Sequence, residues 1–286
     1  MPVRSAAIDR PEPGTARAEL TAVVGRLGVS ILTGGGLLII FVPLLLTLYL
    51  SFFDEKLILF PPRGYTLAWY PAILPNFGAA IAISLELALG SVAGSLLLGV
   101  PAGIALSRYR FRGAGFISTL LLAPLTVPGI ALGLAIYLFL VLIETVTTWP
   151  LTGSLIGLVL SHLVITMPWV VRLSLAGLVN YDRAAEEATA SLGASPIRVI
   201  WRVTLPAMRQ GIIAAALFAF ITSFGNLEMA LFLVAPGVTT LPVAILEYLE
   251  YHVDPLVAAV AVAQMALVGL LLLILDRFVR LGQVVR

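Results

Sequence analysis

The sequence predicts an all-α polytopic membrane protein with six transmembrane helices and with both termini in the cytoplasm. Apolar residues make up 60% of its 286 residues and charged residues only 11%, whereas a soluble domain carries about 25% charged residues. Six stretches are apolar and long enough to cross a hydrocarbon core, which takes about 20 residues of helix. Basic residues gather in alternate connecting segments, as they do on the cytoplasmic side of membrane proteins.

The predicted spans are continuous apolar runs rather than the alternating segments of about ten residues that build a membrane barrel. The first run is not a cleaved signal peptide, because its apolar core exceeds the roughly 7–15 residues of such a signal. The six spans cover residues 27–53, 77–106, 116–143, 153–178, 207–234 and 255–275.

Around these spans the chain divides into four parts. A cytoplasmic tail, 1–26, combines Pro, Ala, Arg and Glu without clear periodicity, which predicts a poorly ordered segment. The first transmembrane helix, 27–53, and an external loop, 54–76, follow. The remaining five helices form a core, 77–280, whose inner loop, 179–209, is much longer than the other connections.

The positions of the basic residues decide the orientation. With the N-terminus inside, every basic residue except Lys56 and Arg63 falls in or beside a cytoplasmic segment, as the positive-inside rule requires. Topology therefore explains the arginines, and the formal charge of +2 gives no reason to expect nucleic acid as a partner. Membrane lipid is the expected surrounding.

Composition also excludes several kinds of chemistry. The chain has no cysteine, which excludes thiolate metal sites and cysteine nucleophiles. Its two histidines, His162 and His252, are too far apart in sequence for a histidine metal motif. A phosphate-binding loop ending in Gly-Lys-Ser/Thr is impossible, because the only lysine is Lys56 in Asp-Glu-Lys-Leu. We therefore expect no catalytic residue, metal or cofactor, and any ATP would bind to another chain.

The long inner loop begins with the pattern of a short helix. Asp182 can cap it, and Glu186 and Glu187 follow in the first turn, where the helix dipole favours anions. Gly193 stands just past the expected C-terminus. One face is small and mildly apolar, which favours docking against a soluble partner; a helix lying on the membrane surface is the alternative. That face consists of Ala184, Ala185, Ala188, Ser191 and Leu192.

A second short helix is predicted directly afterwards. Ser195 can serve as its N-cap and Pro196 as its first-turn proline. Leu205-Pro206 is expected to end this helix and to open the fifth span.

The loop carries a recognisable signature. Glu187-Ala188-Thr189, Gly193 and Val203-x-Leu205-Pro206 resemble the Glu-Ala-Ala…Gly…Ile-x-Leu-Pro signature of inner-membrane permeases of binding-protein-dependent ABC importers. Thr189 and Val203 are mild departures from it. The resemblance extends over about 65–275 through the segments Pro124-x-x-x-Pro128-Gly129, Met167-Pro168-x-Val170-Val171-Arg172 and Thr240-Leu241-Pro242-Val243.

This resemblance implies the ABC importer permease fold in a bacterial or archaeal cytoplasmic (inner) membrane. It also implies three kinds of partner: a second permease subunit, expected to be a different chain, two ATP-binding subunits that hydrolyse ATP, and an extracytoplasmic solute-binding protein. Carried over, residues 182–192 form the coupling helix that enters a cleft on the ATPase. The expected coupling residues are Asp182, Arg183, Glu186, Glu187, Ala188, Gly193, Leu205 and Pro206.

Two carboxylates, Glu86 and Glu228, lie inside predicted spans. An acidic residue at the centre of a span costs about 2.5–3.5 kcal/mol, so such residues usually face a cavity or a partner. An interhelical hydrogen bond for Glu86 and a position near the outer interface for Glu228 are the alternatives. The candidate solute path consists of Glu86, Ser223, Phe224, Asn226 and Glu228.

The segment around Glu228 also bears on the solute. Ser223-Phe224 matches the start of a Ser-Phe-Asp-Glu-Phe stretch in spermidine/putrescine-type permeases, and this resemblance implies a polyamine or another amine-bearing solute. Gly225 and Asn226 replace the two acids of that stretch, which puts polyamine selectivity in question.

Other function classes fit less well. A stand-alone secondary transporter or channel is the main alternative, but it often contains internal repeats, and none is evident in the sequence. An intramembrane enzyme would need catalytic groups such as cysteine or a membrane-embedded aspartate pair, and the predicted spans contain neither.

Overall fold

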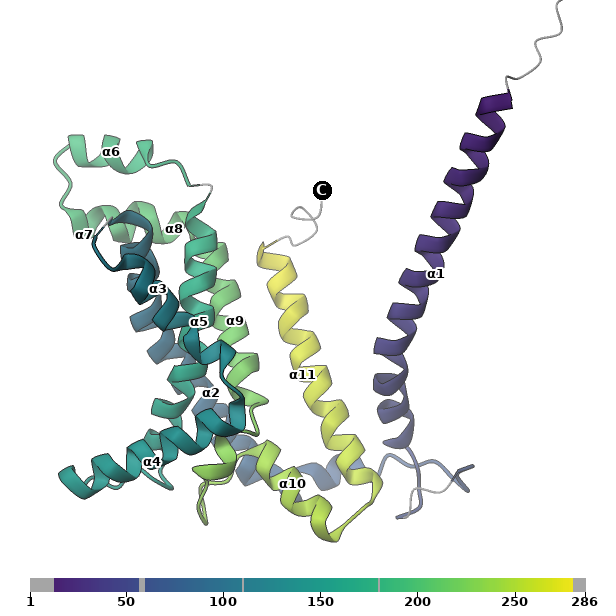
Figure 1. Cartoon of the computed structure of the whole chain (residues 1–286). Helices are drawn as coiled ribbons and strands as arrows, with labels where there is room; N and C mark the ends of the chain where they lie inside the picture. The colour runs from purple at the N-terminus through teal and green to yellow at the C-terminus, as the bar shows by residue number, and fades with distance from the viewer. Residues whose placement is uncertain (1–12, 57–59, 110, 180, 280–286) are drawn as a thin grey trace, which may run out of the picture.

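The computed structural model describes residues 13–56, 60–109, 111–179 and 181–279. Regular structure in these ranges is helical, apart from the isolated bridges of Phe53 with Tyr65 and of Ala235 with Val238 (Figure 1). Within the same ranges five helices are long and apolar enough to span a membrane, or up to six if a bent pair is one span, which confirms the predicted all-α membrane class. The five are α1 (Pro13–Leu50), α2 (Trp69–Arg108), α4 (Gly129–Thr147), α5 (Leu155–Val179) and α11 (Pro255–Val279).

α1 begins at Pro13 and therefore includes part of the segment 1–26, for which the sequence predicts an irregular tail. Proline is well suited to the first turn of a helix, and the following residues include the strong helix formers Ala, Arg, Glu and Leu. Residues 1–12 lie outside the described ranges. Every side chain from 25 to 46 is exposed, so this span buries little of its surface within the chain.

The predicted third span, 116–143, is not one continuous helix. The chain forms α3 (Ala114–Leu122), continues as a 3₁₀ turn, η1 (Ala123–Thr126), and resumes as α4 after a break. Pro128 causes the break, because a proline disfavours helical geometry in the residue before it. Val127 is accordingly extended, with φ −87° and ψ 136°.

The helix found in place of the predicted fifth span, 207–234, is shorter than that prediction, and a sharp bend precedes it. α7 (Pro196–Val199), the π-helical turn η2 (Ile200–Thr204) and α8 (Leu205–Ala207) follow one another directly. α9 (Arg209–Phe224) then runs at 73° to them. The bend therefore falls at Met208 rather than at Leu205-Pro206. α9 ends where Gly225-Asn226 weakens the helix, and a 3₁₀ turn, η3 (Ala230–Phe232), follows.

The centre of the molecule is a bundle of α2, α5 and α9. α2 and α5 are parallel, since Gly90 faces Val159 and Gly103 faces Ser174 farther along both helices. A Cβ atom on Gly103 would lie 2.8 Å from Ser174 Cβ, so glycine permits this close approach. The buried hydroxyls of Ser95 and Thr166 are 2.7 Å apart across the same seam.

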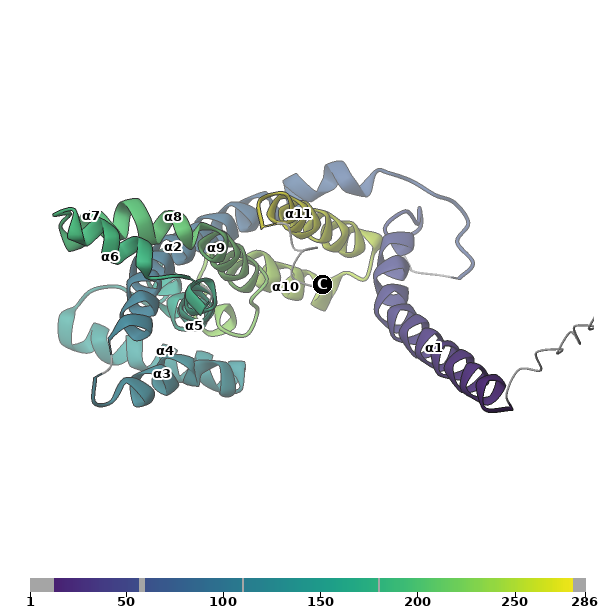
Figure 2. The ribbon, with the colours of Figure 1, turned by 90° about the horizontal axis from the view of Figure 1, so that it is seen from above.

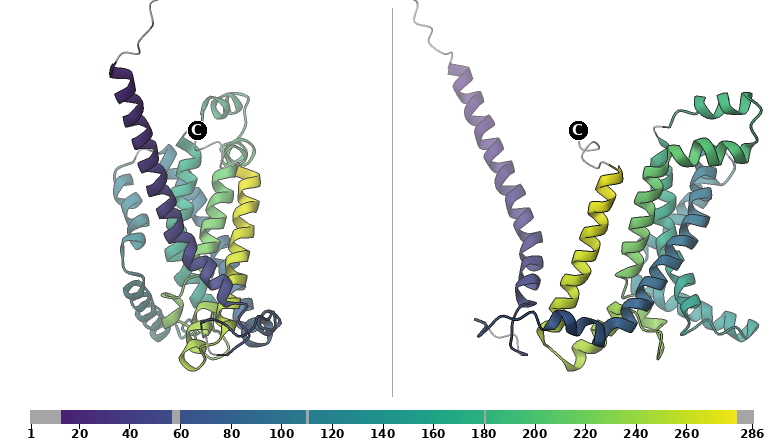
Figure 3. Two further views of the ribbon diagram at one scale, coloured as in Figure 1. Left: turned by 90° about the vertical axis from the view of Figure 1, so that its right-hand side faces the viewer. Right: turned by 180° about the vertical axis from the view of Figure 1, so that it is seen from behind.

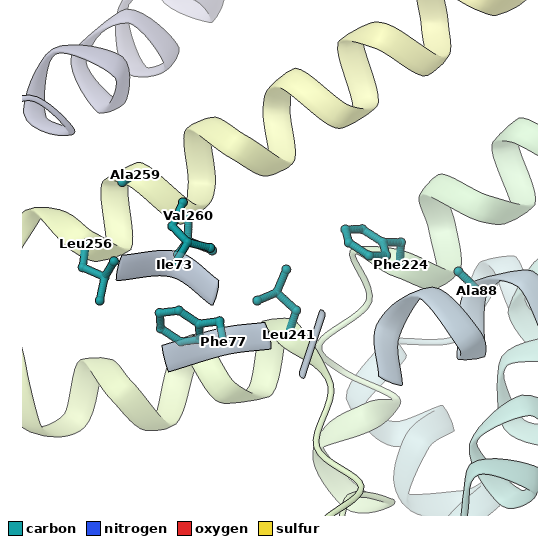
Figure 4. Close-up of a cluster of buried hydrophobic side chains, with 8 residues drawn as sticks. All are labelled: Ile73, Phe77, Ala88, Phe224, Leu241, Leu256, Ala259 and Val260. Carbon is teal, nitrogen blue, oxygen red and sulfur yellow. The ribbon is translucent and has the colours of Figure 1, made fainter. Parts of the chain in front are cut away.

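A second cluster joins the bundle to α11. The start of α2 supplies Ile73 and Phe77, which lie between α11 and α10 (Leu241–Tyr251) in the close-up of Figure 4. Leu241 begins α10, and its backbone N–H donates to the buried Ser84 hydroxyl of α2 at 2.7 Å. The remaining members are Ala88, Phe224, Leu256, Ala259 and Val260.

The helices give the molecule two distinct ends. α6 (Ala184–Ser191), the start of α1 and the last turns of α11 lie at one end, and α10 lies at the other (Figures 1 and 3). α1 approaches α11 only near the α10 end and stands at the edge of the molecule when viewed along the bundle (Figure 2).

Candidate functional site

The inner loop folds as the cap signals predict. The Asp182 carboxylate accepts a hydrogen bond from the backbone N–H of Ala184, the first residue of α6, at 2.9 Å, although Arg183 rather than Asp182 occupies the N-cap position. Gly193 follows the helix with φ +85°, in the left-handed region that glycine adopts without strain. Its N–H donates to the Ala190 carbonyl at 2.9 Å. Ser195 and Pro196 then begin the second helix, with Ser195 in an extended conformation.

α6 has two different sides. The small face that the sequence predicts is exposed along its whole length, and Glu187 beside it is exposed as well. Leu192, directly after the helix, is 89% exposed and gives this side an apolar end. The opposite side carries Glu186, whose side chain is only 13% exposed. The exposed members of the face are Ala184, Ala185, Ala188, Ser191 and Leu192.

Glu186 belongs to a polar cluster that we call the Arg108 cluster, formed by Arg108, Glu186 and Thr204. Nη2 of Arg108 forms an ion pair with Glu186 and donates to the Thr204 hydroxyl at 2.6 Å. The Thr204 hydroxyl donates to Oε1 of Glu186, also at 2.6 Å. Thr204 is buried and the Arg108 side chain is only 17% exposed, so all three groups bind one another largely out of water.

Two further residues border this cluster. Arg183 donates from Nη2 to the Ser107 carbonyl at 2.7 Å, near the end of α2. The Tyr181 hydroxyl is buried without a hydrogen-bond partner among the described residues. Burial raises the pKa of Tyr181, and the Glu186 carboxylate raises it further. A cavity of about 380 Å³ opens here, lined by Ser107, Arg108, Leu178, Val179, Tyr181, Arg183 and Glu186.

Sequence reasoning missed Arg108, Thr204, Ser107 and Tyr181 as members of this site. Arg108 attracts notice only as a cytoplasmic charge, and Thr204 occupies the unspecified position of Val203-x-Leu205-Pro206. An available signal was the pair Glu186-Glu187, because neighbouring residues on a helix point in different directions and cannot share one role. Leu205 and Pro206 belong to α8, next to Thr204, and not to the exposed face of α6.

The candidate solute-path residues separate into two groups. Glu86, in α2, and Glu228, after α9, are both exposed on the surface of the chain. Ser223 and Phe224 are buried, at 1% and 3% exposure, so they pack inside the bundle instead of beside Glu228. Asn226 is half-buried, and its side-chain oxygen accepts a hydrogen bond from the Met229 N–H at 2.8 Å.

Glu228 has a defined neighbour. Its carboxylate lies against Gly129, the first residue of α4, where any side chain would overlap it. The start of a helix carries partial positive charge and is a favourable place for a carboxylate. Gly129 therefore makes room for the Glu228 carboxylate. The two residues come from segments about one hundred residues apart in the sequence.

No metal site accompanies these groups in the described ranges, where no set of three or more histidine, aspartate or glutamate side chains is placed to hold an ion. The described residues form a bundle of helices long enough to span a membrane, a short exposed helix at one end of it, and two exposed carboxylates, Glu86 and Glu228.

Comparison with known proteins identifies the class. Residues 95–281 match the family described as binding-protein-dependent transport system inner membrane component, and the chain belongs to this family. It is thus a multi-pass inner-membrane permease subunit of an ABC importer, and ATP hydrolysis resides in partner subunits. Membership also implies a binding protein as a partner.

Individual relatives agree with this assignment. The chain is 30% identical over 238 residues to the putrescine transport system permease protein PotI of Escherichia coli K12, covering 82% of this chain and 84% of PotI. This confirms the expected similarity to polyamine permeases. A probable molybdenum ABC transporter permease of Haloferax volcanii is 33% identical over 183 residues, 63% of this chain and 68% of that one.

The fold has a counterpart among solved structures. A bacterial ABC transporter involved in the import of the acidic polysaccharide alginate contains a chain that superposes with a TM-score of 0.68, covering 90% of this chain and 97% of that one. At 16% sequence identity, this likeness concerns the fold alone.

Proposed function

We propose that α6 is the coupling helix of this permease and that it docks on an ATP-binding subunit, one of two in the complete importer. The observation that carries the proposal is the contrast between the two sides of α6. One side is held by the Arg108 cluster, and the other presents a small exposed face ending in Leu192. The exposed Glu187 adds a charge that a basic residue of the ATPase can pair with.

Docking can be tested directly. The chain has no cysteine, so a cysteine introduced at Ala188 or Leu192 is its only thiol. In a complex co-purified with its ATP-binding subunits, a cross-linker at either position should capture the ATPase. A cysteine at Thr148, at the opposite end, should not. Equal capture from both ends would contradict the docking of α6.

The proposal also sets the orientation of the chain. The end that carries α6, the start of α1 and the end of α11 is placed in the cytoplasm, and the α10 end faces outward. In this arrangement the tail 1–26 and the loop 179–209 are cytoplasmic, and the loop 54–76 is external. The distribution of arginine supports this orientation.

We expect a labelling experiment to give this topology. Single cysteines at Arg112 and Arg198 should resist a membrane-impermeant reagent added from outside intact cells, whereas cysteines at Arg63 and Thr148 should react, because basic segments remain on the cytoplasmic side. Permeabilised cells are the control, in which all four should react. Labelling of Arg198→Cys from outside would overturn the orientation and the docking proposal together.

For the solute, we propose a small cationic or amine-bearing molecule, delivered by an extracytoplasmic binding protein. Glu86 and Glu228 are exposed carboxylates in segments for which the sequence predicts membrane spans, where an unpaired charge is costly. A second permease subunit, expected to be a different chain, would cover these surfaces and leave both acids beside the path. The relation to PotI supports a polyamine. The molybdenum relative gives the competing solute class.

Uptake by a Glu228→Gln variant tests the role of this acid. In proteoliposomes that contain the whole importer and its binding protein, uptake of the solute should fall several-fold. The reason is that the amide keeps the shape of the side chain and removes the charge that attracts a cation. Glu250→Gln, at an exposed acid of α10, is the matched control. Unchanged uptake in Glu228→Gln would remove Glu228 from the path.

A complementary measurement identifies the solute class without the permease. Ligands released from the cognate binding protein, purified without added solute, should include an amine. An oxyanion in their place would exclude the cationic solute and would leave the docking of α6 untouched.

A further inference from the structure

The Arg108 cluster joins three segments that are distant in sequence. Arg108 is the last residue of α2, Glu186 lies in the first turn of α6, and Thr204 ends η2. Arg108 and Glu186 are separated by 78 residues, and Arg108 and Thr204 by 96. Each of the three side chains binds the other two. The cluster therefore closes the inner loop onto the end of a membrane-spanning helix.

A second bond reinforces this connection. Arg183, directly before α6, donates to the Ser107 carbonyl. Ser107 is in the last turn of α2, where unpaired carbonyls carry partial negative charge and a cation is favourable. The beginning of α6 is thus attached to the end of α2 through two successive residues, Ser107 and Arg108.

α6 needs such an attachment. It has only eight residues, and isolated helices of that length are not stable in water. The face opposite Glu186 is exposed. α6 contacts α7 and η2, and the bonds of Glu186 and Arg183 attach it to α2.

The burial of the ion pair matters for this role. An exposed pair would be weak and screened by water, but Arg108 and Glu186 are only 17% and 13% exposed. A buried pair with satisfied hydrogen bonds contributes a defined geometry more than net stability. A fixed position of α6 relative to α2 is what the permease needs if it is to respond to a movement of the ATP-binding subunit.

We infer that Arg108, Glu186 and Thr204 are positioning residues that clamp the coupling helix to α2, so that a displacement of α6 by the ATPase moves α2. This inference rests on the proposed docking of α6. α2 has 40 residues, about 60 Å along its curved axis at 1.5 Å per residue, and its first turns run across the α10 end of the bundle (Figure 3). It carries Glu86 and contacts α10 at its far end. The clamp therefore links the ATPase side to the whole depth of the permease.

The first readout is the amount of solute moved per ATP hydrolysed, in proteoliposomes with the complete importer. For Arg108→Gln and for Glu186→Gln this ratio should fall by about tenfold or more, because removing one partner of a buried pair disrupts its geometry. The ATP-binding subunits should remain attached. Thr204→Val, which keeps the volume of the side chain and removes the hydroxyl, should lower the ratio less. Arg112→Gln, at an exposed arginine near the same end, is the control and should behave as wild type.

Rescue distinguishes positioning from a general structural role. A single nitrogen of Arg108, Nη2, makes both contacts of the cluster, so the single amino group of lysine can replace it. Arg108→Lys should therefore keep most of the ratio that Arg108→Gln loses. Failure of lysine to do better than glutamine would overturn the inference.

The second readout is a distance. Spin labels on Leu97→Cys of α2 and Ala190→Cys of α6 are the only labels on this chain, because it has no cysteine of its own; the partner subunits are used in cysteine-free form. Their distance distribution in the assembled complex should be narrow with Arg108 present and broad in Arg108→Gln. A narrow distribution in Arg108→Gln, or a wild-type transport ratio in that variant, would overturn the clamp.

Glu187→Arg separates this inference from the proposed function. Glu187 is exposed and takes no part in the Arg108 cluster, so the distance distribution should stay narrow in this variant while ATPase stimulation falls. Full stimulation with a narrow distribution would contradict the docking proposal but not the clamp. A broadened distribution would contradict the clamp.

Discussion

Gly193→Val is expected to abolish most transport while leaving the membrane bundle folded. Gly193 ends α6 with φ +85° and has open space around it, so the effect arises from the backbone and not from a clash. A left-handed conformation costs a residue other than glycine roughly 1–2 kcal/mol, which lowers the ratio of native to non-native loop conformations by a factor of about 5–30. Uptake and binding-protein-stimulated ATPase activity, measured in the reconstituted importer, should both fall.

The matched control is Gly113→Val. Gly113 has φ +95° and is also surrounded by open space, so valine is strained there in the same way, but it precedes α3 and lies outside the inner loop. Both variants should lose a similar amount of stability, and only Gly193→Val should lose stimulation. Equal loss of stimulation in the two variants would mean that the conformation after α6 has no special part in coupling.

Gly103→Val should damage the bundle itself. The new Cβ atom would lie 2.8 Å from Ser174 Cβ and 3.3 Å from the Val171 carbonyl oxygen, at a close approach of α2 to α5. Overpacking of this kind costs about 1–3 kcal/mol. We expect a lower yield of assembled importer. We also expect a lower midpoint of thermal unfolding in detergent, measured by size-exclusion chromatography after heating.

Gly269→Val is the corresponding control, because Gly269 is also helical, in α11, and a Cβ atom there meets nothing within 4 Å. Its midpoint should stay near that of the wild type. If Gly103→Val unfolds at the same temperature as Gly269→Val, the close packing of α2 on α5 does not limit the stability of the permease.

The sequence was informative where structure is determined locally. Asp182, Gly193 and Ser195-Pro196 mark the helix ends of the inner loop because capping involves residues only a few positions apart. The Arg108 cluster could not be predicted in this way. Its members are separated by 18 to 96 residues, and nothing in the periodicity of α2 or α6 indicates which of their charges will meet.

Hydropathy predicted the spans but not their interruptions. Pro128 and Gly225-Asn226 were visible in the sequence, yet the apolar residues around them favoured uninterrupted helices at 116–143 and 207–234. In the structure the missing N–H of proline and the weak helix propensity of the Gly-Asn pair prevail.

The direction of side chains at membrane depth was also not predictable. Ser223 and Phe224 are close to Glu228 in sequence, but the helix ends between them, so two side chains are buried and the third is exposed. For Glu86, the neighbouring Ser84 and Leu87 are buried, and the turn of the helix directs the carboxylate outward.

The parallel pairing of α2 with α5 has a consequence for the synthesis of the chain. Ser95 of α2 finds its partner, Thr166, only 71 residues later, and at about 5–20 residues per second a ribosome needs roughly 4–14 s to reach it. During that interval the Ser95 hydroxyl lacks its partner across the seam, although a serine hydroxyl in a helix can bond to the backbone carbonyl one turn earlier. The polar contact between α2 and α5 therefore forms only after α5 has entered the membrane.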